Sequence, residues 1–191
     1  MIEMTALARK PTLVGDRIRL VPVKPEHAAE MHRILSDPEV DRLTGTHATF
    51  TVDQIREHAE KMAKRTDRLD FVIEDKASAA VLGDLAVLDV DPPNESAAMR
   101  IALGPAHQGS GYGPEAIRLL QAYVFNVVGL HRLQLDVFDF NERAIRAYEK
   151  CGFRHEGRLR DALLWEGERH DSLIMAVLRP QYLARSVTTG A

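Results

Sequence analysis

The chain has 191 residues, and its 25 lysines and arginines nearly balance its 28 aspartates and glutamates. This length suits one domain with a substantial core, and no basic run is long enough to follow a nucleic-acid backbone. No apolar run reaches the roughly 20 residues that would span a bilayer, and the N-terminal residues lack the apolar core of a secretory signal. We therefore expect a cytoplasmic protein without a nucleic-acid or membrane partner.

The cysteine and histidine residues argue against a metal site. Cys151 is the only cysteine, which excludes an intramolecular disulfide and a zinc-binding CxxC pair. The eight histidines show neither HxH nor HxxxH spacing. We expect a reducing compartment and no bound metal.

The first half of the chain predicts one strand and two helices, followed by three strands. Alternating polarity predicts a strand over 16–23, and the proline that follows predicts a helix over 25–35. Thr51 and Gln54 match a capping box, so a second helix is expected over 51–66. Apolar residues then recur at every second position, and the next strands are expected at 69–75, 80–90 and 97–103. Their short polar connections favour an antiparallel meander.

The second half of the chain predicts a crossover, then a helix and two strands. A wide apolar stripe predicts a helix over 114–128, and alternation predicts a strand over 133–139. Because both follow the strand 97–103, the three elements are expected to form a βαβ unit with two parallel strands. Asn141 is expected to cap a helix over 142–150. The last strands are expected near 153–165 and 170–178.

No internal repeat or low-complexity run divides the chain, and only its two ends are expected to be loose. This leaves 1–12 as a loose N-terminal segment, 13–183 as a single domain and 184–191 as a loose C-terminal tail.

The segment HQGSGYGPEA, residues 107–116, brings three glycines to the start of a predicted helix. Gly109, Gly111 and Gly113 occupy alternate positions, and Pro114 follows where a helix tolerates proline. The N–H groups of such a loop can turn inward on an anion, and the helix N-terminus adds partial positive charge at the same point. The pattern indicates a phosphate-binding loop, with a flexible connection as the plainer alternative.

Two other phosphate-binding designs fit this loop less well. The GxxxxGK[ST] pattern of a P-loop is absent. Gly111, Gly113 and Ala116 match the G-x-G-x-x-A fingerprint of dinucleotide-binding folds. Asp136, about 20 residues later, also suits that fingerprint. That fold, however, places its first glycine almost directly after a strand, whereas residues 104–110 intervene here, so an NAD-binding oxidoreductase is the weaker alternative.

Several motifs, in order along the chain, resemble the GNAT superfamily of N-acetyltransferases. Residues 108–113, QGSGYG, are similar to its Q/R-x-x-G-x-G/A signature, and residues 141–153 match N-x-x-A-I-x-x-Y-E-K-x-G-F. Together with DSLIMAVL at 171–178, they resemble the branch of ribosomal-protein N-terminal acetyltransferases, from about residue 69 onward. The resemblance implies an α/β (α+β) GNAT fold: a mixed, mostly antiparallel sheet of about seven strands with about four helices and a splayed parallel pair at the cofactor site.

The resemblance also implies a cofactor site. Acetyl-coenzyme A would place its pyrophosphate on the loop formed by Gln108, Gly109, Ser110, Gly111, Tyr112 and Gly113. Its pantetheine arm would lie between the splayed strands, against the backbone of Ile101 and Leu103 and the side chain of Asn141. A β-bulge is implied in the strand that carries Ile101. Tyr148 would protonate the departing thiolate, because a tyrosine pKa near about 10 keeps the phenol protonated at neutral pH.

The sequence leaves open which group deprotonates the amine. Related sequences often carry a glutamate at the register of Ala98, and a small residue where Arg100 stands. The nearest acidic candidates are Asp84, Asp89 and Glu95. None is assigned, because water can also relay the proton.

Three further residues lie near these motifs without an assigned role in the chemistry. Cys151 is expected to pack at a helix end, because no histidine motif accompanies it as an acyl-cysteine mechanism would require. His107 stands beside the loop, where it could aid the phosphates. Trp165 could line the acceptor site or contact a second subunit, and a packing role fits equally well.

These observations predict an enzyme that moves acetyl from acetyl-coenzyme A to a primary amine by direct attack in a ternary complex. The amine, a protein N-terminus or a small molecule, stays open because acceptor loops vary on a shared core. A non-catalytic acyl-coenzyme A sensor is the rival: the missing strand glutamate favours it, and Tyr148 opposes it. The resemblance also implies a homodimer.

Overall fold

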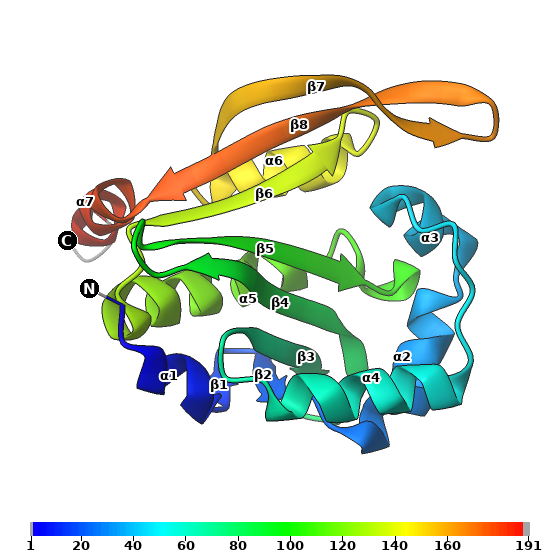
Figure 1. The fold of residues 1–191 in the computed structure, drawn as a ribbon, viewed down its shortest axis with the longest axis horizontal. Coiled ribbons are helices and arrows are strands. Elements are labelled where there is room, and N and C mark those ends of the chain that lie inside the picture. The colour runs from blue at the N-terminus through cyan, green and yellow to red at the C-terminus, as the bar shows by residue number, and fades with distance from the viewer. Residues whose placement is uncertain (1, 189–191) are drawn as a thin grey trace.

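The computed structural model describes residues 2–188, and residues 1 and 189–191 lie outside the described part of the chain. The described residues form one eight-stranded sheet with the order β1-β2-β3-β4-β5-β6-β8-β7 (Figure 1). The strands are β1 (Leu13–Val14), β2 (Ile18–Pro22), β3 (Leu69–Asp75), β4 (Val81–Asp91), β5 (Ser96–Leu103), β6 (Arg132–Phe138), β7 (Arg154–Trp165) and β8 (Glu168–Leu178).

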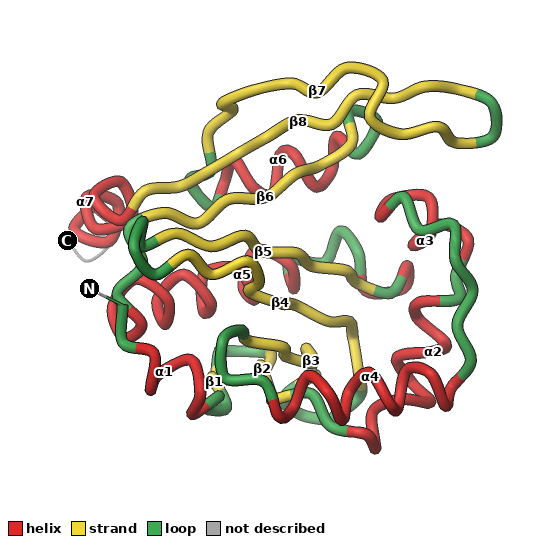
Figure 2. Tube along the Cα trace, in the orientation of Figure 1, coloured by secondary structure: helices red, strands yellow, loops and turns green. Residues whose placement is uncertain are grey.

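Helices lie between some of these strands along the chain, and loops or turns join the others, as the tube in Figure 2 shows. They are α1 (Met4–Arg9), α2 (Ala28–Leu35), α3 (Pro38–Thr44), α4 (Val52–Lys64), α5 (Tyr112–Tyr123), α6 (Glu142–Lys150) and α7 (Arg179–Thr188). Short helical turns add η1 (Pro25–His27), η2 (Pro105–His107) and η3 (Val124–Val128). The expected mixed, mostly antiparallel α/β sheet is confirmed, although the described residues hold more strands and helices than predicted.

Cap chemistry places two helices where the sequence predicted them. At the start of α4 the Thr51 N–H donates to Gln54 Oε1 at 2.8 Å, and the Gln54 N–H donates to Thr51 Oγ1 at 3.2 Å. At the start of α6 the Ala144 N–H donates to Asn141 Oδ1 at 3.2 Å. These bonds satisfy N–H groups that have no partner inside the first helical turn, so both boundaries follow from local sequence.

Helices cover both faces of the sheet. On one face a large hydrophobic cluster takes side chains from α1, α5 and α6, among them Leu7, Ile117 and Tyr148. On the other face a smaller cluster takes Met31 of α2 and Val40 of α3. We call these the α5 face and the α3 face. Successive side chains of a strand point to opposite faces, so each strand residue can be assigned to one of them.

β5 and β6 are the predicted parallel pair, and they stay together only briefly. Their last ladder pair joins Ala98 to Gln134. β5 then continues along β4 as far as Leu103, while β6 continues along β8 as far as Phe138. In Figure 1 the two strands diverge toward α3. This divergence opens the sheet at its centre.

The expected β-bulge in the strand ahead of the glycine loop is wrong. From Ala98 to Leu103, β5 pairs with β4 without a shift in register. The extra residue belongs to β4, between Leu88 and Asp91, where Asp89 has a φ of 51°. The divergence therefore comes from the path of β6, which follows β8, and not from an extra residue in β5.

The N-terminal segment 1–12 was expected to be loose, and this is wrong for α1. Leu7 is fully buried, and the Tyr123 hydroxyl of α5 donates a hydrogen bond of 2.6 Å to the carbonyl of Ala6. A helix this short is stable only because its apolar side chains pack on the rest of the fold, and a local sequence pattern cannot predict that packing.

Two other helices lie where none was predicted. α3 opens on Asp37, whose Oδ1 accepts from the Glu39 N–H at 2.9 Å, and Pro38 takes the first helical position. α7 includes residues 184–188, which were expected to be loose, and residues 189–191 of that tail lie outside the described part of the chain.

Candidate active site

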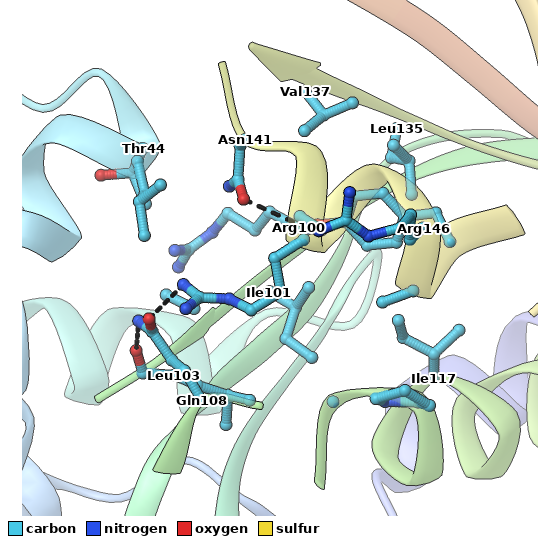
Figure 3. A pocket seen from close by; sticks show the side chains of 18 of the residues that line it. Thr44, Arg100, Ile101, Leu103, Gln108, Ile117, Leu135, Val137, Asn141 and Arg146 are labelled. Carbon is cyan, nitrogen blue, oxygen red and sulfur yellow. Dashed lines mark hydrogen bonds between the residues drawn. The ribbon is translucent and has the colours of Figure 1, made fainter. Parts of the chain in front are cut away.

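The divergence of β5 and β6 forms a cleft of about 570 Å³. Figure 3 shows side chains from both strands around it, with Ile101 and Leu103 from β5 and Leu135 and Val137 from β6. Further lining residues come from the glycine loop and the start of α5, from α6, and from α3. The cleft therefore passes through the sheet, from the α5 face to the α3 face.

The glycine loop has a backbone that needs glycine at two positions. Gly109 and Gly111 have φ values of 76° and 85°, which side-chain-bearing residues rarely adopt. A Cβ on Gly111 would lie 3.0 Å from Arg17 Nη2. Gly113 sits in the first turn of α5, where a Cβ would approach Leu103 to 3.4 Å. Gly111, Gly113 and Pro114 at the start of α5 line the cleft, and the anion site expected there stays a prediction.

Arg17 of the β1–β2 turn holds this loop in shape. Its Nη1 donates to the Ser110 carbonyl at 3.0 Å, and its guanidinium lies 4.6 Å from the centre of the Tyr112 ring. Burial alone would raise the pKa of Glu115, but N–H donors from Arg17 and Ile18 and the Arg17 guanidinium lower it. The carboxylate of Glu115 therefore stays charged and ties α5 to β2.

The predicted loop residues do not all reach the cleft. Gln108 lines it together with the three glycines of the loop. Ser110 and Tyr112 belong to the same loop but not to the lining, because both are turned toward Arg17. The rings of His107 and Tyr112 pack edge to face, with 6.5 Å between the ring centres, and His107 also lies outside the lining.

The backbone of β5 is open toward the cleft at Ile101. The Gly104 N–H donates to Leu82 O in β4 at 2.9 Å, and N–H groups alternate in direction along a strand, so those of Leu103 and Ile101 point toward β6. The ladder with β6 ends before both residues. Gln108 Nε2 donates a hydrogen bond of 2.7 Å to the Leu103 carbonyl. Of the two predicted backbone contacts, Ile101 is therefore the one whose N–H and carbonyl are both available to a ligand.

Asn141 and Tyr148 line the same cleft from α6, as predicted. The Asn141 Oδ1 is used as the helix cap. Tyr148 is 8% exposed, and its ring meets Phe153 edge-on at 6.0 Å. Burial raises the pKa of Tyr148 well above the ordinary tyrosine value, and electrostatic interactions with Asp136 and Cys151 raise it further. The phenol is therefore protonated across the physiological pH range.

Three cations of α6 line the cleft and were missed in the sequence: Arg143, Arg146 and Lys150. Arg143 also donates to Gln108 Oε1. Their spacing of three and four residues puts them along one side of a helix, which is a signal that the sequence did contain. They add positive charge to the cleft, and the bond from Arg143 to Gln108 links this row to the glycine loop.

Arg100 and Asp136 line the cleft on the α3 face. In β5, Ala97 and Met99 belong to the larger cluster, so Arg100 points the other way. In β6, Leu135 and Val137 belong to that cluster, so Asp136 also points to the α3 face. Asp136 is the one carboxylate among the described lining residues, and the sequence singled it out only for the dinucleotide fingerprint.

The three acidic residues considered as bases do not line the cleft. Asp84 is 7% exposed and forms an ion pair with Arg100 at 3.0 Å. Asp89 lies at the bulge of β4 and Glu95 in the β4–β5 turn, each with a φ of 51°. A direct role in proton transfer therefore has no geometric support for any of them.

Cys151 and Trp165 also lie outside the cleft lining. Cys151 is 1% exposed, and burial raises the pKa of its thiol, which disfavours a nucleophilic thiolate. Trp165 stacks on His47, with 4.9 Å between the ring centres.

Residues 17–154 match the family model described as acetyltransferase (GNAT) domain. The chain belongs to the GNAT acetyltransferase family. Spermidine N(1)-acetyltransferase of Escherichia coli K12 is 27% identical over 173 residues, which cover 91% of this chain and 92% of that protein. The Vibrio cholerae enzyme of the same name is 31% identical over 134 residues, covering 70% of this chain and 77% of that protein.

The solved structure of spermidine N-acetyltransferase from Vibrio cholerae in complex with CoA and spermine has the same fold. It aligns with a TM-score of 0.82 at 25% identity, covering 88% of this chain and 99% of that one. A GCN5-related N-acetyltransferase from Brucella melitensis aligns with a TM-score of 0.77 at 28% identity, covering 92% of this chain and 81% of that one.

The expected GNAT N-acetyltransferase is thus confirmed, and acetyl-coenzyme A, the expected co-substrate, is the donor that GNAT acetyltransferases use. The oxidoreductase alternative is rejected. The ribosomal-protein branch, the homodimer and the cytoplasmic location stay predictions. Within residues 2–188, no helix is long and apolar enough to cross a bilayer, and no three potential metal ligands form a cluster.

Proposed function

We propose that the cleft transfers acetyl from acetyl-coenzyme A to a primary amine by direct attack in a ternary complex. The observation that carries this proposal is the passage of the cleft through the sheet. A thioester bound along the α5 face can present its carbonyl carbon at the opening between β5 and β6, and an amine can reach it from the α3 face. Both substrates then meet without a covalent enzyme intermediate.

The donor is held by backbone groups and by cations. Its pyrophosphate lies on Gly109, Gly111 and the first turn of α5, where N–H groups and the helix dipole favour negative charge. The cations of α6 add further attraction for the phosphates. The pantetheine arm takes the place of a strand beside β5, with the N–H and carbonyl of Ile101 as its partners, and passes Asn141.

The amine nitrogen attacks the thioester carbonyl carbon, a C–N bond forms, and the C–S bond breaks. A backbone N–H of β5 stabilises the developing oxyanion. Tyr148 donates its proton to the departing sulfur, and water in the open cleft carries away the proton of the amine. Burial raises the pKa of Tyr148, so the phenol still carries its proton at neutral pH and is available as the donor when the C–S bond breaks.

The acceptor is a primary amine, either a protein N-terminus or a small molecule. The curated relatives named above act on spermidine, and the quoted motifs resemble enzymes of protein N-termini. The cofactor side of the cleft does not discriminate between these, because it is built for the donor.

Thiol release from acetyl-coenzyme A, followed with a thiol reagent over a panel of primary amines, tests the proposal. Amine-dependent release that saturates with both substrates is the expected result, with the acetylated amine identified by mass spectrometry. Calorimetry with coenzyme A runs alongside. Saturable binding without thiol release on any amine would replace the transferase with the acyl-coenzyme A sensor.

A further inference from the structure

Arg100 and Asp136 flank the opening of the sheet on the α3 face. Ala98 and Gln134 form the last ladder pair of β5 and β6. Because side chains alternate, Arg100 and Asp136 are the next residues of the two strands that point to that face. One cation and one carboxylate therefore stand on opposite sides of the gap through which the amine must approach.

Arg100 is fixed by its neighbour strand and keeps donors to spare. Its Nη1 lies 3.0 Å from Asp84 Oδ2, and the side chain of Asp84 is 10% exposed while that of Arg100 is 50% exposed. Asp84 offsets part of the charge, but one contact uses one of five N–H donors. The rest of the planar guanidinium is free to bind a second carboxylate, in the two-bond geometry that arginine favours.

The remaining acceptor wall carries no charge. It is formed by Val40, Leu43 and Thr44 of α3, Thr46, Ala102 of β5 and Phe138 of β6. The carboxylates of α3, Glu39 and Asp41, lie outside the lining of this cleft and beside Trp165 instead. A polyamine brings several ammonium groups, each of which needs a partner, and the described lining offers Asp136 alone.

We propose that the acceptor is a small amine that also carries a carboxylate, such as a free amino acid with an apolar side chain, and not a polyamine. The proposal rests on the transferase function above. The carboxylate binds Arg100, the ammonium group lies toward Asp136 beside the thioester, and the apolar part packs on α3. The proton that the ammonium group loses before attack passes to Asp136, directly or through water, and the C–N and C–S bond changes are those given above.

The test compares free leucine, leucine amide and spermidine as acceptors in the thiol-release assay. The two leucine compounds differ in the carboxylate and in the basicity of the amine, so the change in their ratio of kcat/KM between wild type and Arg100→Gln isolates carboxylate recognition. We expect the acid to be favoured over the amide by about tenfold or more, and spermidine to be the poorest of the three. Arg100→Gln should bring the acid down to the level of the amide, mainly through KM, and should leave the amide little changed.

Arg100→Gln leaves the buried Asp84 carboxylate without its ion pair, so a second variant combines it with Asp84→Asn. Both should lose the same preference, with folding checked by circular dichroism. Arg33→Gln, an exposed arginine of α2 away from the cleft, is the matched control and should keep it. Equal kcat/KM for acid and amide, or a preference for spermidine, would overturn the inference and leave the transferase intact. No thiol release with any amine would instead overturn the transferase itself.

Discussion

The Arg17 guanidinium donates a hydrogen bond of 3.0 Å to the carbonyl oxygen of Ser110, across 93 residues of sequence. The turn before β2 thus holds the glycine loop from a position outside the cleft lining. The shape of the predicted anion-binding loop therefore depends on a residue far away in the sequence.

Replacing Arg17 with alanine should loosen the loop. We expect KM for acetyl-coenzyme A to rise about three- to tenfold with little change in kcat, because the charge-assisted hydrogen bonds of Arg17 to Ser110 and Glu115 are lost. Arg19→Ala removes a comparable ion pair, with Glu74, from the adjoining strand β2 and serves as the control. An unchanged KM in Arg17→Ala would show that the loop holds its shape alone.

Gly111→Ala should weaken both the fold and donor binding. The residue has a φ of 85°, which costs about 1–2 kcal/mol for alanine, and the new Cβ would press on Arg17. Gly167→Ala is the matched control, since Gly167 has a φ of 88° but open space around it in the β7–β8 turn. Thermal unfolding should report a loss in both variants, and calorimetry a loss of coenzyme A affinity in Gly111→Ala alone.

Tyr148→Phe should lower kcat by about 100-fold or more while KM for acetyl-coenzyme A changes little. The phenyl ring keeps the edge-on contact with Phe153, so the fold should persist. Because burial raises the pKa of Tyr148 in the folded protein, the phenol stays protonated beyond the ordinary tyrosine value of about 10. Its contribution to the free energy of unfolding is therefore complete below about pH 10 and is lost only as the pH rises above that value. The pH–kcat profile should show no alkaline fall from this group below about pH 10. A fall in kcat below about pH 10 that is present in the wild type and absent in Tyr148→Phe would contradict the raised pKa of Tyr148.

Lys150→Gln should raise KM for acetyl-coenzyme A at low salt and have a smaller effect at high salt. The lysine lines the cleft next to Cys151, whose Sγ lies 3.7 Å from the Pro114 carbonyl at the start of α5, and ions screen its attraction for the phosphates of the donor. Lys64→Gln, at the exposed end of α4, is the control. The same salt dependence of KM in wild type and Lys150→Gln would exclude a phosphate contact.

Leu7→Ala should destabilise the whole domain by about 2–5 kcal/mol, because the side chain is fully buried between α1 and the sheet. Met4→Ala on the same helix, at a position 39% exposed, should change stability by about 0.5 kcal/mol or less. Denaturant unfolding measures both. Equal small effects would mean that the N-terminal segment is loose after all.

Much of the site could be predicted because its parts are local. The glycines, the Asn141 cap and the helix that carries Tyr148 follow from turn, cap and periodicity rules within a few residues of sequence. Ser110 and Tyr112 show the limit of such rules. Both belong to the predicted loop, but Arg17 turns them away from the cleft.

The sequence alone determined seven of the strands, the helices α2, α4, α5 and α6, their order, and that a glycine-rich loop precedes a helix in a βαβ crossover, since these depend on short periods and caps. Tertiary structure decided where β5 and β6 part, because that depends on β6 following β8. It also decided that Asp136 and Arg100 share one face and that α3 lines the cleft. Contacts between distant segments depend on packing and strand divergence, which no window of neighbouring residues contains.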